Sequence, residues 1–394
     1  MGMKIRSTGF VFLTFCLWGA GCSPRTIPAA NDAGVEVFSD WTETCDGSKR
    51  RTLPENLNAK GPYDVGAVTV ELPRYRLEVW YPALPQSAAA VDAKIYDIRK
   101  ALAPAEAEKV SDQDNPWQPC DCADGLPIEN VSDPFPLVVF VHGTASFRTQ
   151  TLGLVTHLAS RGYVVAAADH PGLYLADTLA LVCGYEPTDS RDLEGDIELA
   201  IETMRFPEGE LEFLRGRVDL ERIALIGHSA GGSAVASAAD LPGVKAVIPL
   251  SGGTRVDVPE VQSLFMAALE DSVVPASRSL EAYERSVGKR SYVALDGSGH
   301  LAFSSLCDTR NADGENLLEV GESSGLCGTN FAGLLFDCDP GYRPPDEINP
   351  PIYAAVTAVV DEALSCRAVD WQNQVQGFPA VDEILREDAA QPAP

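Results

Sequence analysis

Between residues 137 and 295, short apolar runs alternate with helical patterns, and this alternation limits the possible folds more than any other feature. Residues 137–141 (LVVFV) are continuously apolar, as expected for a parallel strand that is buried on both faces. Further strands are expected at 164–168, 223–226, 244–250, 264–269 and 292–295, with helices at about 148–160, 192–204, 230–239, 277–287 and 352–364. Repeated strand–helix units predict an α/β fold with a mostly parallel central sheet flanked by helices.

Two more strands are expected before this series. Residues 65–72 and 75–81 are rich in β-branched and aromatic residues and are separated by Pro73, a pattern typical of an antiparallel pair. They bring the sheet to about eight strands. A long insertion, 83–134, then separates the second strand from the third, and we expect a helix at 89–101 within it. Loops of this length are usually functional or cross-linked.

The N-terminus has the pattern of an export signal. Lys4 and Arg6 precede an apolar stretch at 10–18 that is too short to span a bilayer. Cys22 follows three small residues, so we expect a lipoprotein signal peptide at 1–21 and a lipidated Cys22. The alternative is an ordinary cleaved signal with an incidental cysteine.

This pattern predicts a bacterial protein that is exported to the cell envelope, in the periplasm or anchored by lipid to the outer membrane, or secreted. Residues 22–60 are polar and irregular and are expected to form a tether. The folded domain is expected at 61–372. An acidic tail rich in Ala and Pro would follow at 373–394.

The chain contains ten cysteines. If Cys16 is removed with the signal and Cys22 carries lipid, eight cysteines remain. An even number is suited to disulfides in an exported protein, and the sequence leaves their pairing open. Cys120 and Cys122 are so close in sequence that we expect each to pair elsewhere. A zinc site is the alternative, but Cys-x-Cys lacks the usual spacer, so no metal is expected. A second addition, 307–350, is also rich in cysteine and follows the last expected strand.

The charge excludes some partners. Lys and Arg number 30 and Asp and Glu number 57, which gives a net charge of −27. Nucleic acid binding needs a basic face, and anionic lipid attracts basic segments. We therefore expect no nucleic acid partner, and contact with a membrane only through the lipid anchor. The oligomeric state stays open.

The strongest chemical motif is Gly227-His228-Ser229-Ala230-Gly231. It follows the apolar run 223–226 and opens a helix of small residues, which is the context of a nucleophile elbow. Ser229 is therefore the predicted nucleophile. The alternative is a glycine-rich turn in which the serine only caps the helix.

A serine hydroxyl needs a base, and the chain has five histidines. His300 is the predicted base, because it follows the strand at 292–295 in a Gly-rich loop. The other four histidines have less suitable positions. His142 directly follows the strand at 137–141, next to the loop expected to bind the oxyanion, and His157 lies in an expected helix. His170 comes before the nucleophile in the chain, and His228 lies inside the elbow and is directed away from Ser229.

The third member of the triad should follow a strand between the nucleophile and the base. Asp271 is the predicted acid, and Glu270 and Asp257 are alternatives. The oxyanion needs two N–H donors. We expect them to come from the backbones of Ala230, next to the nucleophile, and of Thr144, in the turn after 137–141.

With these residues placed, the chain resembles the α/β-hydrolase superfamily, and in particular bacterial serine hydrolases near the platelet-activating-factor acetylhydrolase, cutinase-like polyester hydrolase and lipase groups. The stretches that carry the resemblance are 61–66 (GPYDVG), 140–143 (FVHG) with 147–149 (FRT), 158–167 (LASRGYVVAA), the elbow, 270–275 (EDSVVP) and 297–300 (GSGH). The chain also resembles proteins described as dienelactone hydrolase-like. Dienelactone hydrolase itself uses a Cys nucleophile, however, and this chain has Ser229 at that position.

The resemblance implies the α/β-hydrolase fold and a serine esterase that cleaves carboxylic esters of lipid, polyester or small-molecule type, without a cofactor. Two alternatives remain. The same triad could serve a peptidase or an acyltransferase that acts on an envelope component. The chain could also be a non-catalytic envelope lipoprotein that keeps the fold.

Overall fold

The structure is a computed structural model, and it describes residues 41–43, 49–130 and 133–388. The predicted signal peptide, the lipidated Cys22 and most of the predicted tether lie outside these residues. The hairpin of β1 (Trp41–Glu43) and β2 (Lys49–Arg51) is the first element described.

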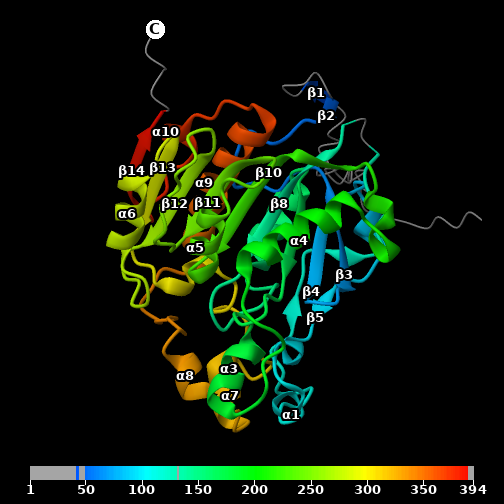
Figure 1. Cartoon of the computed structure of the whole chain (residues 1–394), viewed down its shortest axis with the longest axis vertical. Coiled ribbons are helices and arrows are strands. Elements are labelled where there is room, and N and C mark those ends of the chain that lie inside the picture. Colours follow the sequence, from blue (N-terminus) through cyan, green and yellow to red (C-terminus); the bar gives the residue numbers. More distant parts are fainter. Residues whose placement is uncertain (1–40, 44–48, 131–132, 389–394) are drawn as a thin grey trace, which may run out of the picture. The chain divides into compact units, whose positions relative to one another are not determined.

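A ten-stranded sheet forms the centre of the domain (Figure 1). From edge to edge its strands are β14 (Val381–Glu387), β13 (Arg290–Leu295), β12 (Gln262–Ala268), β11 (Val244–Leu250), β10 (Val218–His228), β8 (Phe135–Val141), β9 (Val164–Ala168), β4 (Arg76–Ala83), β3 (Asp64–Glu71) and β7 (Ala123–Asp124). The six strands from β13 to β9 are all parallel, and β4 runs antiparallel to β9. The predicted α/β fold with a mostly parallel sheet is confirmed, with one added strand at each edge, β14 and the two-residue β7.

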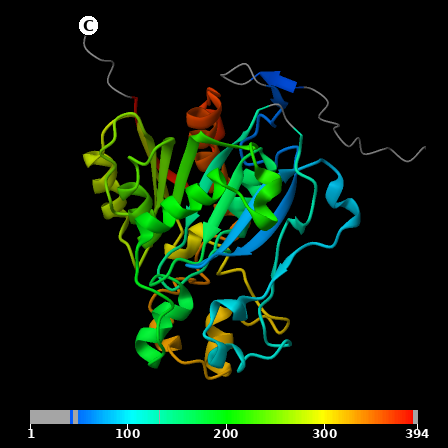
Figure 2. The ribbon, with the colours of Figure 1, turned by 45° about the vertical axis from the view of Figure 1, so that its right-hand side comes forward.

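Helices cover both faces of the sheet (Figures 1 and 2). On one face, α2 (Leu152–Ser160) and α9 (Pro345–Ser365) pack into one apolar core. On the other face, α4 (Leu193–Arg205), α5 (Ala230–Ser237) and α6 (Ala276–Arg285) pack into a second core. The central strands are buried on both sides, which explains their continuously apolar sequences. Within the described residues, no helix is both long and apolar enough to cross a bilayer.

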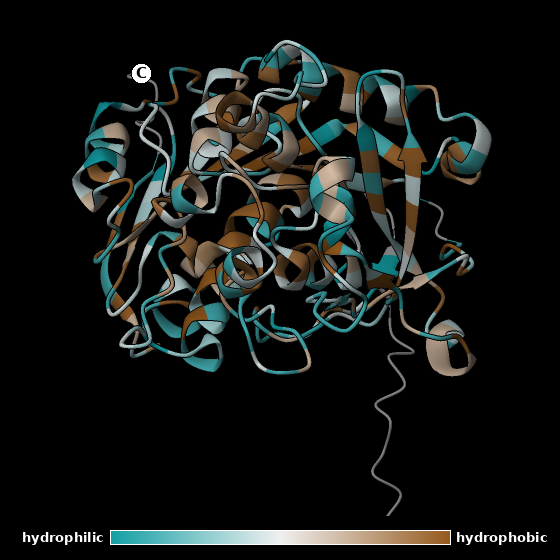
Figure 3. Cartoon of the chain, turned by 90° about the horizontal axis from the view of Figure 1, so that it is seen from below, coloured by the Kyte–Doolittle hydropathy of each residue, from teal (hydrophilic) through white to brown (hydrophobic). Residues whose placement is uncertain are grey.

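Four further short helices lie together beyond the sheet, at the bottom of Figure 1. They are α1 (Pro104–Ala107) from the first insertion, α3 (Leu175–Cys183) after β9, and α7 (Leu317–Ser323) and α8 (Thr329–Gly333) from the Cys-rich segment. With the 3₁₀ helix η2 (Ile98–Ala101), we call this group the cap. Figure 3 views the molecule from the cap side, with hydrophobic stretches in the middle of the view and hydrophilic loops along its lower rim.

A disulfide and a buried carboxylate tie the cap segments to one another. A disulfide joins Cys183, at the end of α3, to Cys327, just before α8. The carboxylate of Glu106, on α1, is 2% exposed and accepts hydrogen bonds from the Tyr185 hydroxyl (2.6 Å) and from the backbone N–H of Cys327 (2.8 Å). Lys109 pairs with the same carboxylate. One buried charge therefore joins three cap segments that are far apart in sequence.

The helix expected at 89–101 is wrong. This stretch forms the 3₁₀ helix η1 (Ser87–Ala90), the short strand β5 (Ile95–Tyr96) and η2. β5 pairs with β6 (Gln118–Pro119), and the Asp97 side chain accepts a hydrogen bond from Arg99 N–H at the start of η2. Here tertiary strand pairing outweighs local helix propensity.

The region expected to be a tail at 373–394 also differs. β14 pairs antiparallel with β13 and extends the sheet, and Ile384 and Leu385 pack against the cores on opposite faces. The ion pair of Arg290 with Glu387 supports the same edge. The acidic composition of this region reflects a half-exposed edge strand rather than a tail outside the fold.

The disulfides correct one prediction. Cys120 and Cys122, expected to pair elsewhere, are bonded to each other, with their Cα atoms 5.0 Å apart. This separation lies within the range that a disulfide spans, because the chain bends at the residue between them. Cys307 pairs with Cys338 inside the Cys-rich segment, and Cys366 is also disulfide-bonded.

Candidate active site

Ser229 stands in the sharp turn between β10 and α5. Its backbone has φ 56° and ψ −117°, a conformation that is strained for a residue with a side chain. The turn needs glycine on both sides of the serine. A Cβ atom at Gly227 would lie 2.2 Å from the carbonyl oxygen of Gly231, and one at Gly231 would lie 2.2 Å from that of Val141. The turn therefore holds Ser229 at the carboxyl edge of the sheet.

His300 and Asp271 contact each other directly. Nδ1 of His300 lies 2.8 Å from Oδ2 of Asp271, which also accepts a hydrogen bond from the Ser251 hydroxyl (2.8 Å). The other oxygen of Asp271 accepts the backbone N–H groups of Val273 and Val274, at 2.8 and 2.7 Å. These hydrogen bonds orient the carboxylate. Because Asp271 contacts Nδ1 of the imidazole, it does not occupy Nε2.

The carboxylate of Asp271 is held in its ionised form. Burial alone would raise its pKa, but the hydrogen bond and charge of His300 and the N–H of Val274 lower the pKa below its ordinary value. An ionised Asp271 accepts the proton on Nδ1 of His300. The imidazole is then in the tautomer whose Nε2 can take a proton.

Ser229 and His300 line the same pocket, together with Thr144. Among the described residues, the Ser229 hydroxyl forms no hydrogen bond with any other group, His300 included. Hydrogen bonds between nucleophile and base are often long in unliganded enzymes and shorten when substrate binds. The structure thus brings the predicted nucleophile and base to one cavity, and the predicted acid contacts the base.

The oxyanion loop has one unused donor. The N–H groups on either side of Thr144 are satisfied: that of Gly143 by Oε1 of Gln150 (2.8 Å) and that of Ala145 by the carbonyl of Leu173 (2.9 Å). Within the described part of the chain, no hydrogen bond uses the N–H of Thr144. Ala230 is the first residue of α5, so its N–H has no partner within the helix.

Comparisons with known proteins found one family and two relatives that are similar to this chain. The sequence model of the PETase family, described as PET hydrolase-like, matches residues 127–312. The chain is also similar to platelet-activating factor acetylhydrolase of cattle (Bos taurus), with 29% identity across 26% of this chain and 31% of the relative. The protein of the same name from the dog (Canis lupus familiaris) is 28% identical across 27% of this chain and 32% of the relative. The chain has the α/β-hydrolase fold.

The chain spans about a third of the length of the curated relatives that it matches. The family match begins shortly before β8 and ends in the Cys-rich segment, so it includes Ser229, Asp271 and His300. It leaves out β3, β4, most of the first insertion, and α7 and α8. Most of the cap therefore lies outside the matched region.

The two alternative acids make other contacts. Glu270 accepts the backbone N–H of Ser298 (2.8 Å), and exposed Asp257 pairs with Arg255. Neither is bonded to His300 in the described structure. Glu270 instead holds the loop that carries the base.

The other four histidines are buried and engaged elsewhere. His142 contacts the carbonyl of Gly143 through Nδ1 and accepts the N–H of His170 through Nε2. His157 contacts the hydroxyl of Thr357. Burial lowers the pKa of His157 and of His228 to about 3, so both rings are neutral near pH 7.

Sequence reasoning missed Gln150. Its amide is fully buried and donates to Nδ1 of His228 (2.7 Å), while its oxygen accepts the N–H of Gly143. The other ring nitrogen of His228 donates to the carbonyl of His300 (2.9 Å). Gln150 and His228 thus connect the oxyanion loop to the loop of the base. In the sequence Gln150 looks like any residue at the start of the helix expected at 148–160.

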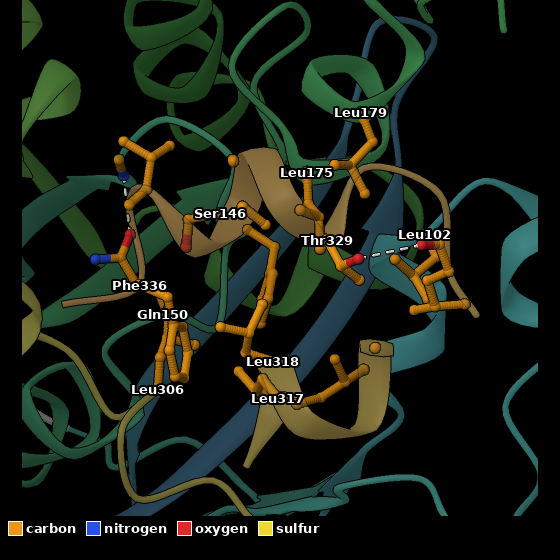
Figure 4. Close-up of a pocket in the computed structure, with 18 of the residues that line it drawn as sticks. Leu102, Ser146, Gln150, Leu175, Leu179, Leu306, Leu317, Leu318, Thr329 and Phe336 are labelled. Atoms are coloured by element: carbon orange, nitrogen blue, oxygen red, sulfur yellow. Dashed lines mark hydrogen bonds between the residues drawn. The ribbon is translucent and has the colours of Figure 1, made fainter. Parts of the chain in front are cut away.

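The cavity of about 280 Å³ next to Ser229 has mainly apolar walls (Figure 4). The side chains on its cap side are aliphatic or aromatic: Ile98, Leu102, Leu175, Leu179, Leu317, Leu318, Val320, Leu326, Phe331, Leu335 and Phe336. Among the described residues, no three His, Cys, Asp or Glu side chains are grouped so as to hold a metal ion. The site therefore offers a nucleophile, a base and an apolar binding space.

Proposed function

We propose that this chain is a serine hydrolase that cleaves carboxylic esters through an acyl-enzyme. The observation that carries the proposal is the 2.8 Å contact between Asp271 and His300, which lines one apolar cavity together with a strained Ser229. The similarity to two proteins named as acetylhydrolases and to a family described as PET hydrolase-like supports ester cleavage in general.

In the proposed mechanism, Ser229 Oγ attacks the ester carbonyl while Nε2 of His300 takes the hydroxyl proton. The oxyanion accepts hydrogen bonds from the N–H groups of Thr144 and Ala230. His300 then returns the proton to the leaving alcohol, and the acyl group remains on Ser229. Water, deprotonated by His300, attacks the acyl-enzyme; His300 then returns this proton to Ser229 Oγ as the bond to the acyl group breaks and the acid leaves. Asp271 stabilises the imidazolium during both steps.

Chemical labelling tests this proposal directly. A fluorophosphonate should form an adduct on Ser229, and Ser229→Ala should lower kcat/KM for p-nitrophenyl butyrate by about 10⁴-fold or more. Ser237→Ala is the matched control, because this exposed serine lies on α5 and only bonds the carbonyl of Ser233. Full activity in Ser229→Ala, or labelling at another residue, would exclude the mechanism.

We further propose that the protein is exported and anchored to the envelope through a lipid on Cys22. The three described disulfide pairs are compatible with an oxidising compartment. Expression of the full chain in a bacterium with labelled palmitate should label the wild type but not Cys22→Ala. Equal labelling of both would exclude Cys22 as the anchor.

A further inference from the structure

The cap and the segments that flank its helices supply most of the cavity wall, so they limit which groups fit beside Ser229. Leu175 and Leu179 come from α3, and Leu317 and Leu318 come from α7. These side chains point into the cavity in Figure 4. The cavity continues from the predicted oxyanion donors into this aliphatic space, where a chain bonded to the reacting carbonyl would be surrounded by hydrocarbon.

The polar groups of the wall are few and mostly engaged. Arg99 is the one Lys or Arg side chain among the described residues that line the cavity. It forms ion pairs with Asp97 and Asp112 at 2.8 and 2.7 Å. The buried Asn115 Oδ1 and Ser146 Oγ atoms have no partner among the described residues. The wall can therefore accept a neutral polar atom, but its cation is already neutralised and offers no site for a carboxylate.

The volume limits the chain length. A water molecule occupies about 30 Å³ in the liquid, so about 280 Å³ holds roughly nine groups of that size. A methylene group is of similar size. The cavity thus matches an aliphatic chain of about six to nine carbons and is much larger than an acetyl group needs.

We propose that the preferred substrates are esters of neutral, unbranched aliphatic acids of about six to nine carbons, whose acyl chain lies under the cap. This inference rests on the proposed function. Each added methylene that enters the cavity is expected to raise kcat/KM by up to about fourfold. Longer chains gain nothing, because the additional carbons have no apolar wall to contact.

The test is a series of p-nitrophenyl esters from acetate to dodecanoate, measured on the purified wild type. We expect kcat/KM to rise from acetate to octanoate by at least about 30-fold and then to level off or fall. A rate that does not depend on chain length, with clear acetate hydrolysis, would overturn this inference and leave the proposed function intact. No hydrolysis of any ester together with no fluorophosphonate adduct would overturn both.

Variants locate the chain within the cavity. Leu318→Trp should fill the space and lower the ratio of octanoate to acetate kcat/KM by about tenfold or more, and Leu318→Ala should move the optimum to longer chains. Leu334→Trp is the control, because Leu334 is 74% exposed on the same cap and does not line the cavity. Labelling of Ser229 by a small fluorophosphonate shows that each variant is folded. Unchanged ratios in both Leu318 variants would overturn the proposal.

A charged analogue tests the neutral character of the wall. The p-nitrophenyl monoester of octanedioic acid has the length of octanoate with a terminal carboxylate, and we expect its kcat/KM to be at least about 100-fold lower, because a buried charge lacks a partner there. The comparison is repeated at high salt, which screens the net charge of −27. Equal rates for the two esters would contradict the proposal.

Discussion

Oδ2 of Asp337 accepts a 2.8 Å hydrogen bond from the backbone N–H of His300. The same oxygen accepts the backbone N–H of Ser272, next to the predicted acid, at 3.1 Å. Asp337 is adjacent to Cys338, whose disulfide with Cys307 closes the segment. One carboxylate of the Cys-rich segment thus joins the loop of the base to the loop of the acid.

Replacing this carboxylate should therefore impair the base without changing substrate binding. We expect Asp337→Ala to lower kcat for p-nitrophenyl butyrate by about 10- to 100-fold with little change in KM, because small displacements of catalytic groups are costly. Asp337→Asn keeps one carbonyl oxygen and should recover part of the rate. Asp339→Ala, at an exposed carboxylate that only bonds Gly341 N–H, serves as the control. A loss confined to KM would contradict this role.

Much of the fold follows from local sequence. The runs at 137–141 and 223–226 are apolar throughout because β8 and β10 are covered on both faces, and such strands are recognisable without any contact information. The glycines around Ser229 mark the elbow because a Cβ atom would clash there. The chain order of nucleophile, acid and base then predicts Ser229, Asp271 and His300, which follow the carboxyl ends of β10, β12 and β13. Their catalytic roles stay predictions.

The cap did not follow from local sequence, because it depends on partners that are distant in the chain. The helix expected at 89–101 is replaced by strand pairing between β5 and β6, some twenty residues apart. Glu106 resembles a surface acid in the sequence but is buried among Tyr185, Lys109 and Cys327. Long-range contacts of this kind leave no periodic pattern in the sequence.

Gln150 is expected to support the oxyanion loop. Gln150→Leu removes the acceptor of the buried Gly143 N–H and the donor to His228, and an unsatisfied buried group costs about 1–3 kcal/mol. We expect the rate of fluorophosphonate labelling and kcat to fall together by about tenfold or more. Gln150→Glu keeps the acceptor for Gly143 and should lose less. Wild-type labelling rates in Gln150→Leu would show that the loop does not need this side chain.

Buried His157 should make the stability depend on pH. Burial lowers its pKa from 6.5 to about 3, whereas the unfolded chain binds a proton near pH 6.5. Between these values the unfolded state holds the extra proton, so this contribution to stability is complete above pH 6.5 and is lost as the pH falls toward 3. The slope for this residue is about 1.4 kcal/mol per pH unit.

Proton uptake on unfolding measures this effect. We would measure the unfolding enthalpy by calorimetry at pH 5 in two buffers of different ionisation enthalpy, which gives the number of protons taken up on unfolding. His157→Gln should take up about one proton fewer than the wild type. Thr357→Val removes the hydrogen bond to His157 but keeps the ring, so it should retain the wild-type uptake. An uptake unchanged in His157→Gln would mean that the ring is already protonated in the folded state.

The disulfide between Cys183 and Cys327 should hold the cap over the cavity. It closes a loop with a sequence separation of 144 residues, for which chain-entropy arguments give about 5 kcal/mol, whereas Cys120–Cys122 closes a separation of 2. We expect the double variant Cys183→Ser/Cys327→Ser to be cleaved faster by protease within 307–350. Its octanoate-to-acetate ratio of kcat/KM should also fall by about tenfold, because a displaced α3 no longer contacts the acyl chain. Cys120→Ser/Cys122→Ser, which lacks the short disulfide outside the cavity wall, should keep the wild-type ratio; a fall of the same size in both variants would indicate general destabilisation rather than loss of the cap.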